Sequence, residues 1–217
     1  MKVVLFGNRY LRDREEEVLN ALTHALGLGL ACGMSAALFW RGSQLSSLHA
    51  AAGLAYGIAH VIVYLASVAY HYAEHPPLKT RLRVLDQAAI YSAIAGTYTP
   101  VLALGIPSPW NVGLLILTWT ACVVGIIYKV RHWDQPERGS LATYLSFALA
   151  GSLLFLIVGS GPIDESRRVF MASGVLDIAG LAFYVWHYKR FFHTAWHVLV
   201  MIGNLVHFYA VWHYFMV

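Results

Sequence analysis

Long apolar stretches separated by short polar segments make up nearly all of this 217-residue chain. No Lys, Arg, Asp or Glu occurs within residues 18–40, 42–72, 87–128 and 139–163. About 20 apolar residues are enough for a helix to cross the hydrocarbon core of a bilayer. The Gly- and Pro-containing run 105–111 divides the third stretch by a tight turn. The pattern predicts a short cytoplasmic segment, 1–15, and seven spans at about 16–40, 46–72, 84–104, 111–128, 140–160, 169–188 and 192–217.

The composition supports a membrane protein and argues against a soluble one. The chain is 59% hydrophobic and 12% charged, whereas soluble domains contain about 25% charged residues. A soluble bundle would have too little polar surface to cover its helices. We therefore expect an all-α polytopic membrane protein with a seven-transmembrane-helix bundle. The net charge of +4 is explained by basic residues that flank the spans, so we expect no nucleic-acid partner.

The distribution of basic residues predicts the orientation of the spans. Twelve of the 15 Lys and Arg residues lie in the N-terminal segment and in the loops after the second, fourth and sixth spans, and three lie on the opposite side. Loops rich in Lys and Arg stay in the cytoplasm. The N-terminus is therefore expected in the cytoplasm and the C-terminus outside, and we expect a bacterial inner (plasma) membrane.

Two helical His motifs are predicted to lie at the cytoplasmic boundary. Ser67 and His71 are four residues apart near the end of the second span, and His193 and His197 have the same spacing at the start of the seventh. Residues at i and i+4 share one face of a helix. Zinc metalloproteases use this His spacing with a Glu after the first His, which is absent here. Asp86, in the first turn of the third span, falls in the same layer.

Three neutral His ligands with one open position are typical of a catalytic zinc site. In this interpretation His71, His193 and His197 hold Zn²⁺. Asp86 could then hold or deprotonate a water molecule on the metal, and Ser67 could donate a hydrogen bond to that water, to a ligand or to a bound carbonyl. The alternative is a set of interfacial histidines that bond only to their neighbours. Three in one layer beside an Asp favour the metal, because ionisable groups inside membranes usually serve function.

Other ionisable residues in the spans have both functional and structural interpretations. Glu17 and His24 in the first span could orient the His ligands or simply belong to the start of a helix. Asp177 in the sixth span is expected to pack against a polar group of another helix, with a proton relay as the alternative.

Deeper polar residues form a second group. His60 and His207 lie about 15 Å below the proposed metal layer, at 1.5 Å per residue, and Asn204 precedes His207 by one turn. These residues could line a polar cavity, or they could bond the second and seventh spans to each other. The segment 97–100, Thr-Tyr-Thr-Pro, is predicted to kink the third span and to form side-chain to backbone hydrogen bonds.

Four motifs resemble the hemolysin III family, within the superfamily that includes the progestin and adipoQ receptors and the alkaline ceramidases. They are Glu17-x-x-Asn20-x-x-Thr23-His24, Ser67-x-x-x-His71, the segment 86–100 that ends in Ile-Ala-Gly-Thr-Tyr-Thr-Pro, and His193-x-x-x-His197 with His207 beyond it. The resemblance covers nearly the whole chain. It implies seven helices and a zinc held by His71, His193 and His197, with Asp86 and Ser67 close by. Asp177 and Gln87 depart from the family pattern.

These features lead to three functional hypotheses. The first is a zinc-dependent hydrolase of a lipid amide or ester, with a substrate that enters sideways from the membrane. The second is a non-catalytic sensor or receptor for a lipid or a membrane state, in which zinc is structural. The third is a pore-forming or transport protein, in which His60, Asp177 and His207 would matter more than Asp86. All three imply membrane lipids as partners.

Overall fold

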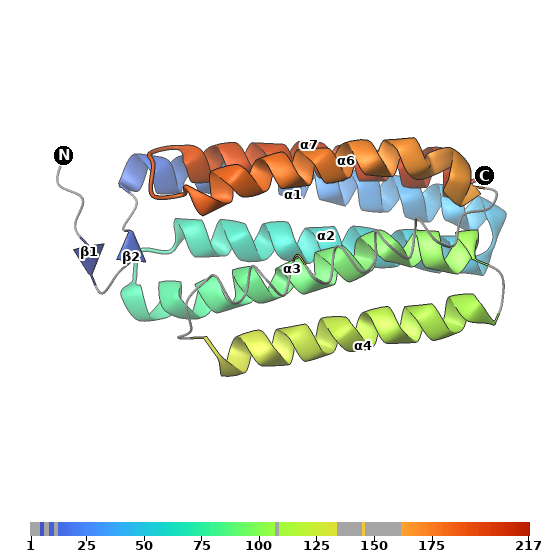
Figure 1. The fold of residues 1–217 in the computed structure, drawn as a ribbon, viewed down its shortest axis with the longest axis horizontal. Coiled ribbons are helices and arrows are strands. Elements are labelled where there is room, and N and C mark those ends of the chain that lie inside the picture. The colour runs from blue at the N-terminus through green and yellow to red at the C-terminus, as the bar shows by residue number, and fades with distance from the viewer. Residues whose placement is uncertain (1–4, 7–8, 11–12, 107–108, 134–144, 146–161) are drawn as a thin grey trace.

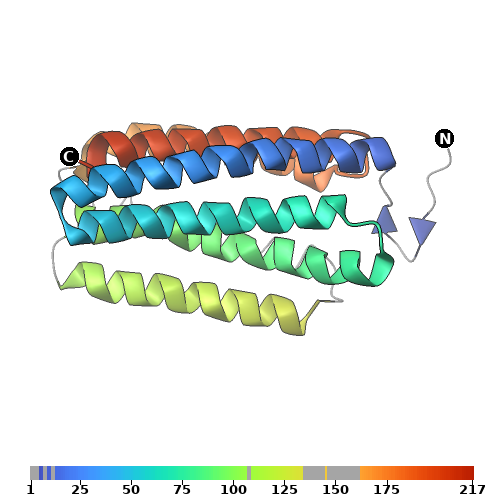
Figure 2. The same ribbon diagram turned by 180° about the vertical axis from the view of Figure 1, so that it is seen from behind.

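The computed structural model describes residues 5–6, 9–10, 13–106, 109–133, 145 and 162–217. Long helices lie roughly antiparallel in a bundle (Figures 1 and 2). A two-stranded antiparallel hairpin, β1 (Leu5–Phe6) and β2 (Arg9–Tyr10), precedes them. The helices are α1 (Arg14–Leu45), α2 (Ser47–Tyr72), α3 (Pro76–Gly105), α4 (Trp110–Arg131), α6 (Pro162–Val185) and α7 (Phe192–Ala210), and a π-helical turn (Val211–Phe215) follows α7.

Within the described ranges, six helices are long and apolar enough to cross a membrane. This confirms an all-α polytopic membrane protein, apart from the small hairpin in the N-terminal segment. The span expected at 140–160 lies, except for Leu145, outside the described residues. Many large apolar side chains point away from the bundle, as a hydrocarbon solvent requires; examples are Leu22, Ile116, Leu117, Val175 and Ile178.

The helices pack in an order that places the first and last of them side by side. α1 contacts both α2 and α7, α3 contacts α2 and α4, and α6 contacts α7. In both views α4 lies at the edge of the bundle. The end of α2 and the start of α7 therefore reach the same end of the bundle, on either side of the start of α1.

The connection between α1 and α2 is shorter than predicted. Residues 41–45, which we expected to connect the two spans, are the end of α1, and Ser46 alone separates the helices. The backbone N–H of Ser46 donates to the Gly42 carbonyl (3.0 Å), while its hydroxyl accepts from the N–H of His49 (3.3 Å). One residue thus caps both helices. A Cβ at Gly42 would lie 2.7 Å from the backbone of His49, so the tight turn requires glycine there.

Two adjacent prolines, Pro76 and Pro77, lie at the start of a helix. α2 ends at Tyr72 as predicted, but α3 begins at Pro76 and not near residue 84. Proline is favoured at the first position of a helix, where its missing N–H has no partner to lose. The basic segment that we expected to be a loop, with Lys79, Arg81 and Arg83, is therefore the first two turns of α3.

The boundaries of the sixth span also differ from the prediction. α6 begins at Pro162, not near residue 169, and ends at Val185. Residues 186–191 connect it to α7, where we expected only residues 189–191. Phe191, just before α7, has a φ of 64°. This left-handed backbone is unfavourable for a bulky residue and makes a sharp entry into the helix that carries His193.

The predicted side-chain to backbone hydrogen bonds in the 97–100 segment are confirmed. The hydroxyl of Thr97 donates to the Ala93 carbonyl at 2.9 Å, and that of Thr99 donates to Ala95 at 2.8 Å. α3 continues through Pro100 to Gly105. Both threonines lie in the turn in which Pro100, having no N–H, cannot donate the usual backbone hydrogen bond of the helix.

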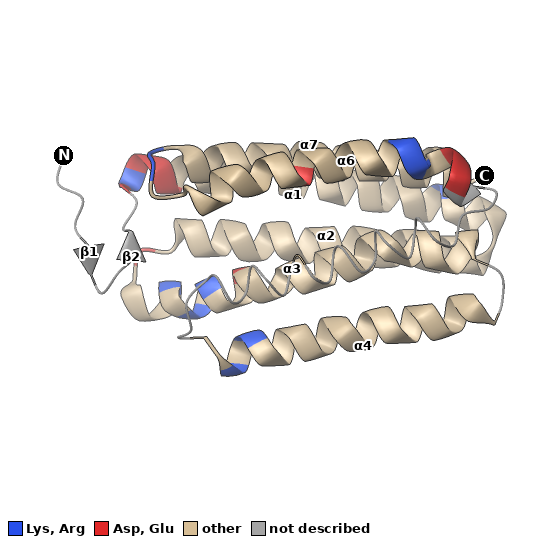
Figure 3. Cartoon of the chain, in the orientation of Figure 1, with Lys and Arg blue, Asp and Glu red and all other residues tan. Residues whose placement is uncertain are grey.

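Lys and Arg gather mainly at one end of the bundle, where α1 and α3 begin and α4 ends (Figure 3). Ion pairs link the first turn of α1 to two loops at this end. Arg14 pairs with Glu74 at 2.7 Å, and Arg190 pairs with Asp13 at 3.3 Å and with Glu15. The basic end is thus also the end at which the histidine motifs lie.

Candidate metal centre

Three buried histidines meet at the basic end of the bundle. His71 lies in the last turn of α2, and His193 and His197 lie in the first turns of α7. Their exposed fractions are 0%, 6% and 1%. Each offers one ring nitrogen, and these three nitrogens all lie within 4.8 Å of one another. The structure therefore brings together three residues that the sequence had assigned to one layer.

The ring positions follow from two simple features of the helices. His193 and His197 share one face of α7 because they are four residues apart, and their ring centroids are 4.5 Å apart. The ring of His71 lies 5.2 Å from that of His193 and 5.0 Å from that of His197. Antiparallel packing, in which α2 ends where α7 begins, thus closes the cluster.

The donor set fits a metal ion. Imidazoles suit Zn, Cu, Fe and Ni, and two ligands at the usual zinc–nitrogen distance are about 3.4 Å apart in a tetrahedral site. Small rotations of the three rings would therefore close them around one ion. The cluster can hold a metal with three protein ligands, which leaves a position open for another group.

The hydrogen bonds of two of these rings assign the nitrogen that would face a metal. Nδ1 of His71 lies 2.7 Å from Oε2 of Glu17. Because a carboxylate only accepts, Nδ1 carries the proton and Nε2 has the lone pair. Nδ1 of His197 lies 3.3 Å from the Thr23 hydroxyl, which donates its own proton to the Asn20 carbonyl at 2.9 Å. The hydroxyl must then accept from Nδ1, so Nε2 of His197 also has the lone pair.

One face of α1 supports the cluster. Glu17, Asn20 and His24 are buried on this face, and their spacing of three and four residues is that of a helix stripe. Asn20 accepts from the Thr194 hydroxyl through Oδ1 at 2.5 Å. The ring of His24 stacks on that of His197. The sequence suggested Glu17 and His24 as partners of the histidines. Glu17 contacts His71, and His24 contacts His197.

Ser67 lies on α2, which carries His71, and Asp86 lies on α3, which packs against α2. Ser67 is one turn before His71 on α2 and is buried. Its hydroxyl oxygen has no hydrogen-bond partner among the described residues, so it can donate to a bound group. Asp86 is half-buried in α3. Its role in chemistry stays a prediction.

A second polar layer ties α2 to α7 deeper in the bundle. The hydroxyl of Tyr56 donates to the Asn204 carbonyl at 3.1 Å, and Nδ2 of Asn204 donates to the Tyr64 hydroxyl at 2.8 Å. His60 is buried here and stacks on Tyr56, with its Nδ1 2.8 Å from the Tyr56 carbonyl. The two bonds of Asn204 are helix-to-helix hydrogen bonds of the kind that we considered as the alternative to a cavity, whereas these contacts of His60 lie within α2.

Asp177 and His207 lie apart from the three histidines. A Cβ at Gly203 would be 2.8 Å from Oδ1 of Asp177, so the carboxylate approaches the backbone of α7 beside the second polar layer. His207 packs against Phe170, with ring centroids 5.5 Å apart. Its buried Nδ1 has no hydrogen-bond partner among the described residues. Neither residue belongs to the three-histidine group.

Sequence reasoning assigned no role to Thr23, although it quoted this residue within a motif. Its position between Asn20 and His24 was the available signal, because Glu17, Asn20 and His24 form a stripe next to it. Lys79 was also missed. It was counted as a loop residue, whereas it lies in the first turn of α3 and contacts Glu17.

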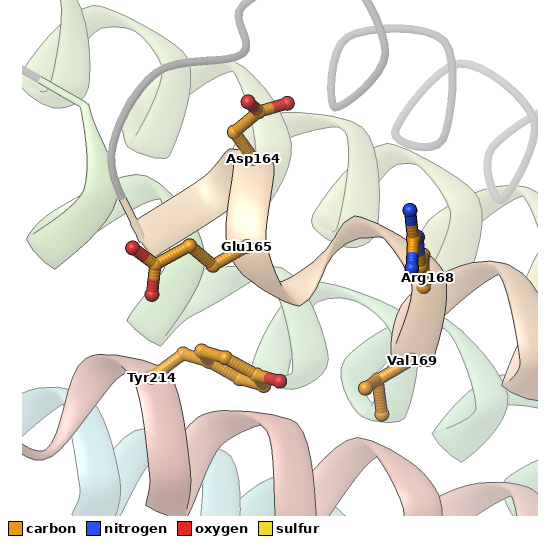
Figure 4. A pocket seen from close by; sticks show the side chains of 5 residues that line it. All are labelled: Asp164, Glu165, Arg168, Val169 and Tyr214. Atoms are coloured by element: carbon orange, nitrogen blue, oxygen red, sulfur yellow. The ribbon is translucent and has the colours of Figure 1, made fainter.

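An open pocket of about 590 Å³ lies at the other end of the bundle, where α6 begins (Figure 4). Asp164, Glu165, Arg168, Val169 and Tyr214 line it. Its acidic and basic side chains sit on the first turns of α6, and Tyr214 belongs to the π-helical turn. This pocket is far along the helices from the histidine cluster and shares no residue with it.

The fold and the site together define a multi-pass membrane protein with a buried three-histidine cluster at one end of its helical bundle. Comparison with known proteins places this protein in a family. Residues 12–208 match the model of the family described as Haemolysin-III related, and the chain belongs to this family.

Relatives from bacteria and mammals share much of the chain. It is 32% identical to Hemolysin-3 of Bacillus cereus over 206 residues, which cover 92% of each protein. It is 29% identical to the Hemolysin-3 homolog of Bacillus subtilis (strain 168), over 92% of this chain and 94% of the relative. Monocyte to macrophage differentiation factor of Homo sapiens is 25% identical over 73% of this chain and 68% of its own length. The resemblance inferred from the motifs is therefore confirmed.

Proposed function

We propose that this protein is a zinc-dependent hydrolase that acts on a lipid amide or ester at the membrane boundary. The observation that carries the proposal is the buried group of His71, His193 and His197, whose ring nitrogens lie within 4.8 Å of one another. Zinc bound there would supply a Lewis acid that polarises a carbonyl and makes water a stronger nucleophile.

The protein groups around the cluster supply the remaining steps. Asp86 accepts a proton as the oxygen of water attacks the carbonyl carbon. Ser67 donates a hydrogen bond to the carbonyl oxygen as negative charge develops on it. The bond from the carbonyl carbon to nitrogen or oxygen then breaks, and Asp86 returns the proton to the leaving amine or alcohol. The products are a fatty acid and the amine or alcohol that carried it.

The setting of the site matches a lipid substrate. We assign the basic end of the bundle to the cytoplasm, because Lys and Arg gather there, and the membrane to the bacterial inner (plasma) membrane. The carbonyls of membrane lipids lie at the interface between the head groups and the hydrocarbon. A site at the end of α2 and the start of α7 is therefore at the depth of such a bond.

A sensor with a structural zinc is the second candidate. It is favoured by the contacts that join three helices at the cluster. Glu17 joins α1 to His71 on α2, and Asn20 joins α1 to Thr194 on α7. A metal that completes such a joint could stabilise one arrangement of helices without turnover, and a lipid that prefers this arrangement would then be sensed.

The two candidates differ in the role of Asp86. The experiment uses purified protein in detergent, with zinc content measured beside hydrolysis of a ceramide and of a phospholipid. We expect turnover in the wild type and its loss in Asp86→Asn with zinc retained. Zinc should be lost in His71→Ala but not in the control His49→Ala, a half-buried histidine at the start of α2, away from the cluster.

Other outcomes separate the alternatives. Zinc without turnover, together with stability that depends on both zinc and lipid, would favour the sensor. Ion flux from liposomes that persists in Asp86→Asn would favour the pore suggested by the name of the Bacillus cereus relative. Unchanged zinc content in His71→Ala would contradict the metal site itself.

A further inference from the structure

We infer that Lys79 is a positioning residue for the metal centre, which acts on His71 through Glu17 and through the end of α2. The inference rests on the proposed zinc site, but it does not depend on whether that site is catalytic. Lys79 lies in the first turn of α3, and its side chain is 27% exposed. It therefore reaches inward from the boundary and does not extend into solvent.

The first contact of Lys79 is with the carboxylate that orients His71. Its Nζ lies 3.2 Å from Oε2 of Glu17, the same oxygen that accepts from Nδ1 of His71 at 2.7 Å. Lys79 and His71 thus share one acceptor atom. The ammonium group and the imidazole N–H fix this oxygen from two directions, which restrains the carboxylate and the ring that it holds.

The second set of contacts is with the end of α2. Nζ lies 3.2 Å from the Tyr70 carbonyl, 3.5 Å from that of His71 and 3.1 Å from that of Ala73. It also lies 4.9 Å from the centroid of the Tyr70 ring. The last carbonyls of a helix have no partner within it and attract cations. Lys79 therefore holds the backbone of His71 as well as its side-chain partner.

The positive charge of Lys79 stabilises the buried carboxylate of Glu17 and, through it, the orientation of the His71 ring. Glu17 is buried, and a buried carboxylate is costly unless it is paired with charge and hydrogen bonds. Lys79 supplies a positive charge beside it. If this charge were removed, Glu17 would gain by turning toward water or another donor, and the ring of His71 would lose its fixed orientation. A ligand whose ring is not held binds metal less tightly.

Lys79 also relates the site to α3. Asp86 is seven residues after Lys79, so the two side chains project from the same face of α3. The bond from Lys79 to the end of α2 anchors the first turn of α3 against that helix. This contact thus also fixes the position of Asp86 relative to α2, the helix that carries His71.

The test measures zinc affinity by competition with a chelator, in the purified full-length protein. Lys79→Met nearly keeps the length of the side chain but removes the charge. We expect this variant to bind zinc about tenfold more weakly, which is the lower end of the loss in metal affinity when a group that orients a ligand is removed. Lys79→Arg keeps the charge and should restore affinity to within about threefold of the wild type on the same scale. Arg81→Met, an exposed cation on the same turn, is the matched control and should bind as the wild type does.

A double-mutant cycle that combines Lys79→Met with Glu17→Gln shows whether Lys79 acts through Glu17. Glu17→Gln should also weaken zinc binding, and adding Lys79→Met to Glu17→Gln should cost less than Lys79→Met costs alone. The thermal stability of the metal-free proteins is measured in parallel. A merely structural role would lower that stability and leave zinc affinity unchanged, which would overturn the inference. If Lys79→Met does not fold, Lys79→Gln takes its place.

The outcomes distinguish this inference from the proposed function. A wild type that binds no zinc would overturn both. Zinc bound equally by the wild type and Lys79→Met would overturn the role of Lys79 alone. Zinc binding that depends on Lys79 in a protein without hydrolase activity would overturn the hydrolase and support the role of Lys79.

Discussion

His24 stacks face to face on His197, with ring centroids 3.6 Å apart and planes inclined by 20°. The rings of His24 and Tyr64 also meet in a T-shaped arrangement, with centroids 5.2 Å apart. Neither nitrogen of His24 has a hydrogen-bond partner among the described residues, and His24 is outside the three-histidine group. His24 therefore packs against the face of the His197 ring, and we expect it to support that ring and not to serve as a ligand itself.

Replacing His24 by Phe should preserve the stack, because a planar ring of similar size keeps the contact with His197. We expect zinc affinity within about threefold of the wild type for His24→Phe, and a loss of about tenfold for His24→Ala, which leaves the ring of His197 free to turn. Chelator competition measures both. If His24→Phe lost zinc as completely as His197→Ala, His24 would be a ligand and this interpretation would be wrong.

Thr23 fixes the tautomer of His197, because its hydroxyl accepts from Nδ1 while donating to the Asn20 carbonyl. Thr23→Val keeps the shape of the side chain and removes the acceptor. Leaving a buried polar group without its partner costs about 1–3 kcal/mol, so zinc should bind about tenfold more weakly. Thr23→Ser retains the hydroxyl and should recover most of the affinity. Equal affinities for Val and Ser would show that the hydroxyl does not hold the ring.

The three-histidine group could be predicted from sequence because it depends on the spacing of residues within one helix and on the number of spans between them. The i, i+4 spacing places His193 and His197 on one face, and the alternation of spans places His71 at the same boundary. Neither step requires knowledge of which helices are neighbours. The depth of a residue in a membrane bundle is thus readable from its distance to the end of a span.

The supporting residues could not be predicted in the same way, because their roles depend on which helices touch. Thr23 reaches His197 only because α1 packs against α7. Lys79 was misplaced for a different reason. A proline can follow the end of one helix or begin the next, and the sequence does not say how soon the next helix starts. Here α3 begins at Pro76, which brings Lys79 over the end of α2.

Close packing between α1 and α2 depends on a missing side chain at Gly27. A Cβ there would lie 2.4 Å from Cε1 of Tyr64, whereas a Cβ at Gly29 would meet nothing within 4 Å. Gly29→Ala should stabilise the protein by up to about 1 kcal/mol through helix propensity. Gly27→Ala should destabilise it by about 1–3 kcal/mol, the usual cost of overpacking. Thermal unfolding in detergent compares the two, and a Gly27→Ala protein as stable as Gly29→Ala would contradict the packing described.

Asn204 and Tyr64 form a hydrogen bond that joins α7 to α2 below the three-histidine group, at 2.8 Å from Nδ2 to the Tyr64 hydroxyl. Asn204→Leu and Tyr64→Phe each remove one side of it, while the bond from Tyr56 to the Asn204 backbone carbonyl remains. Hydrogen bonds between membrane helices contribute about 0.6 kcal/mol on average in double-mutant cycles.

We therefore expect a coupling energy near that value between Asn204→Leu and Tyr64→Phe, measured from the stabilities of the two single variants and the double variant. Tyr56→Phe is the control, because its hydroxyl bonds to a carbonyl that Asn204→Leu retains. Its coupling to Asn204→Leu should be close to zero. A coupling as large for Tyr56 as for Tyr64 would mean that the layer responds as one packed unit, and that the bond between the two side chains is not what joins α2 to α7 at this depth.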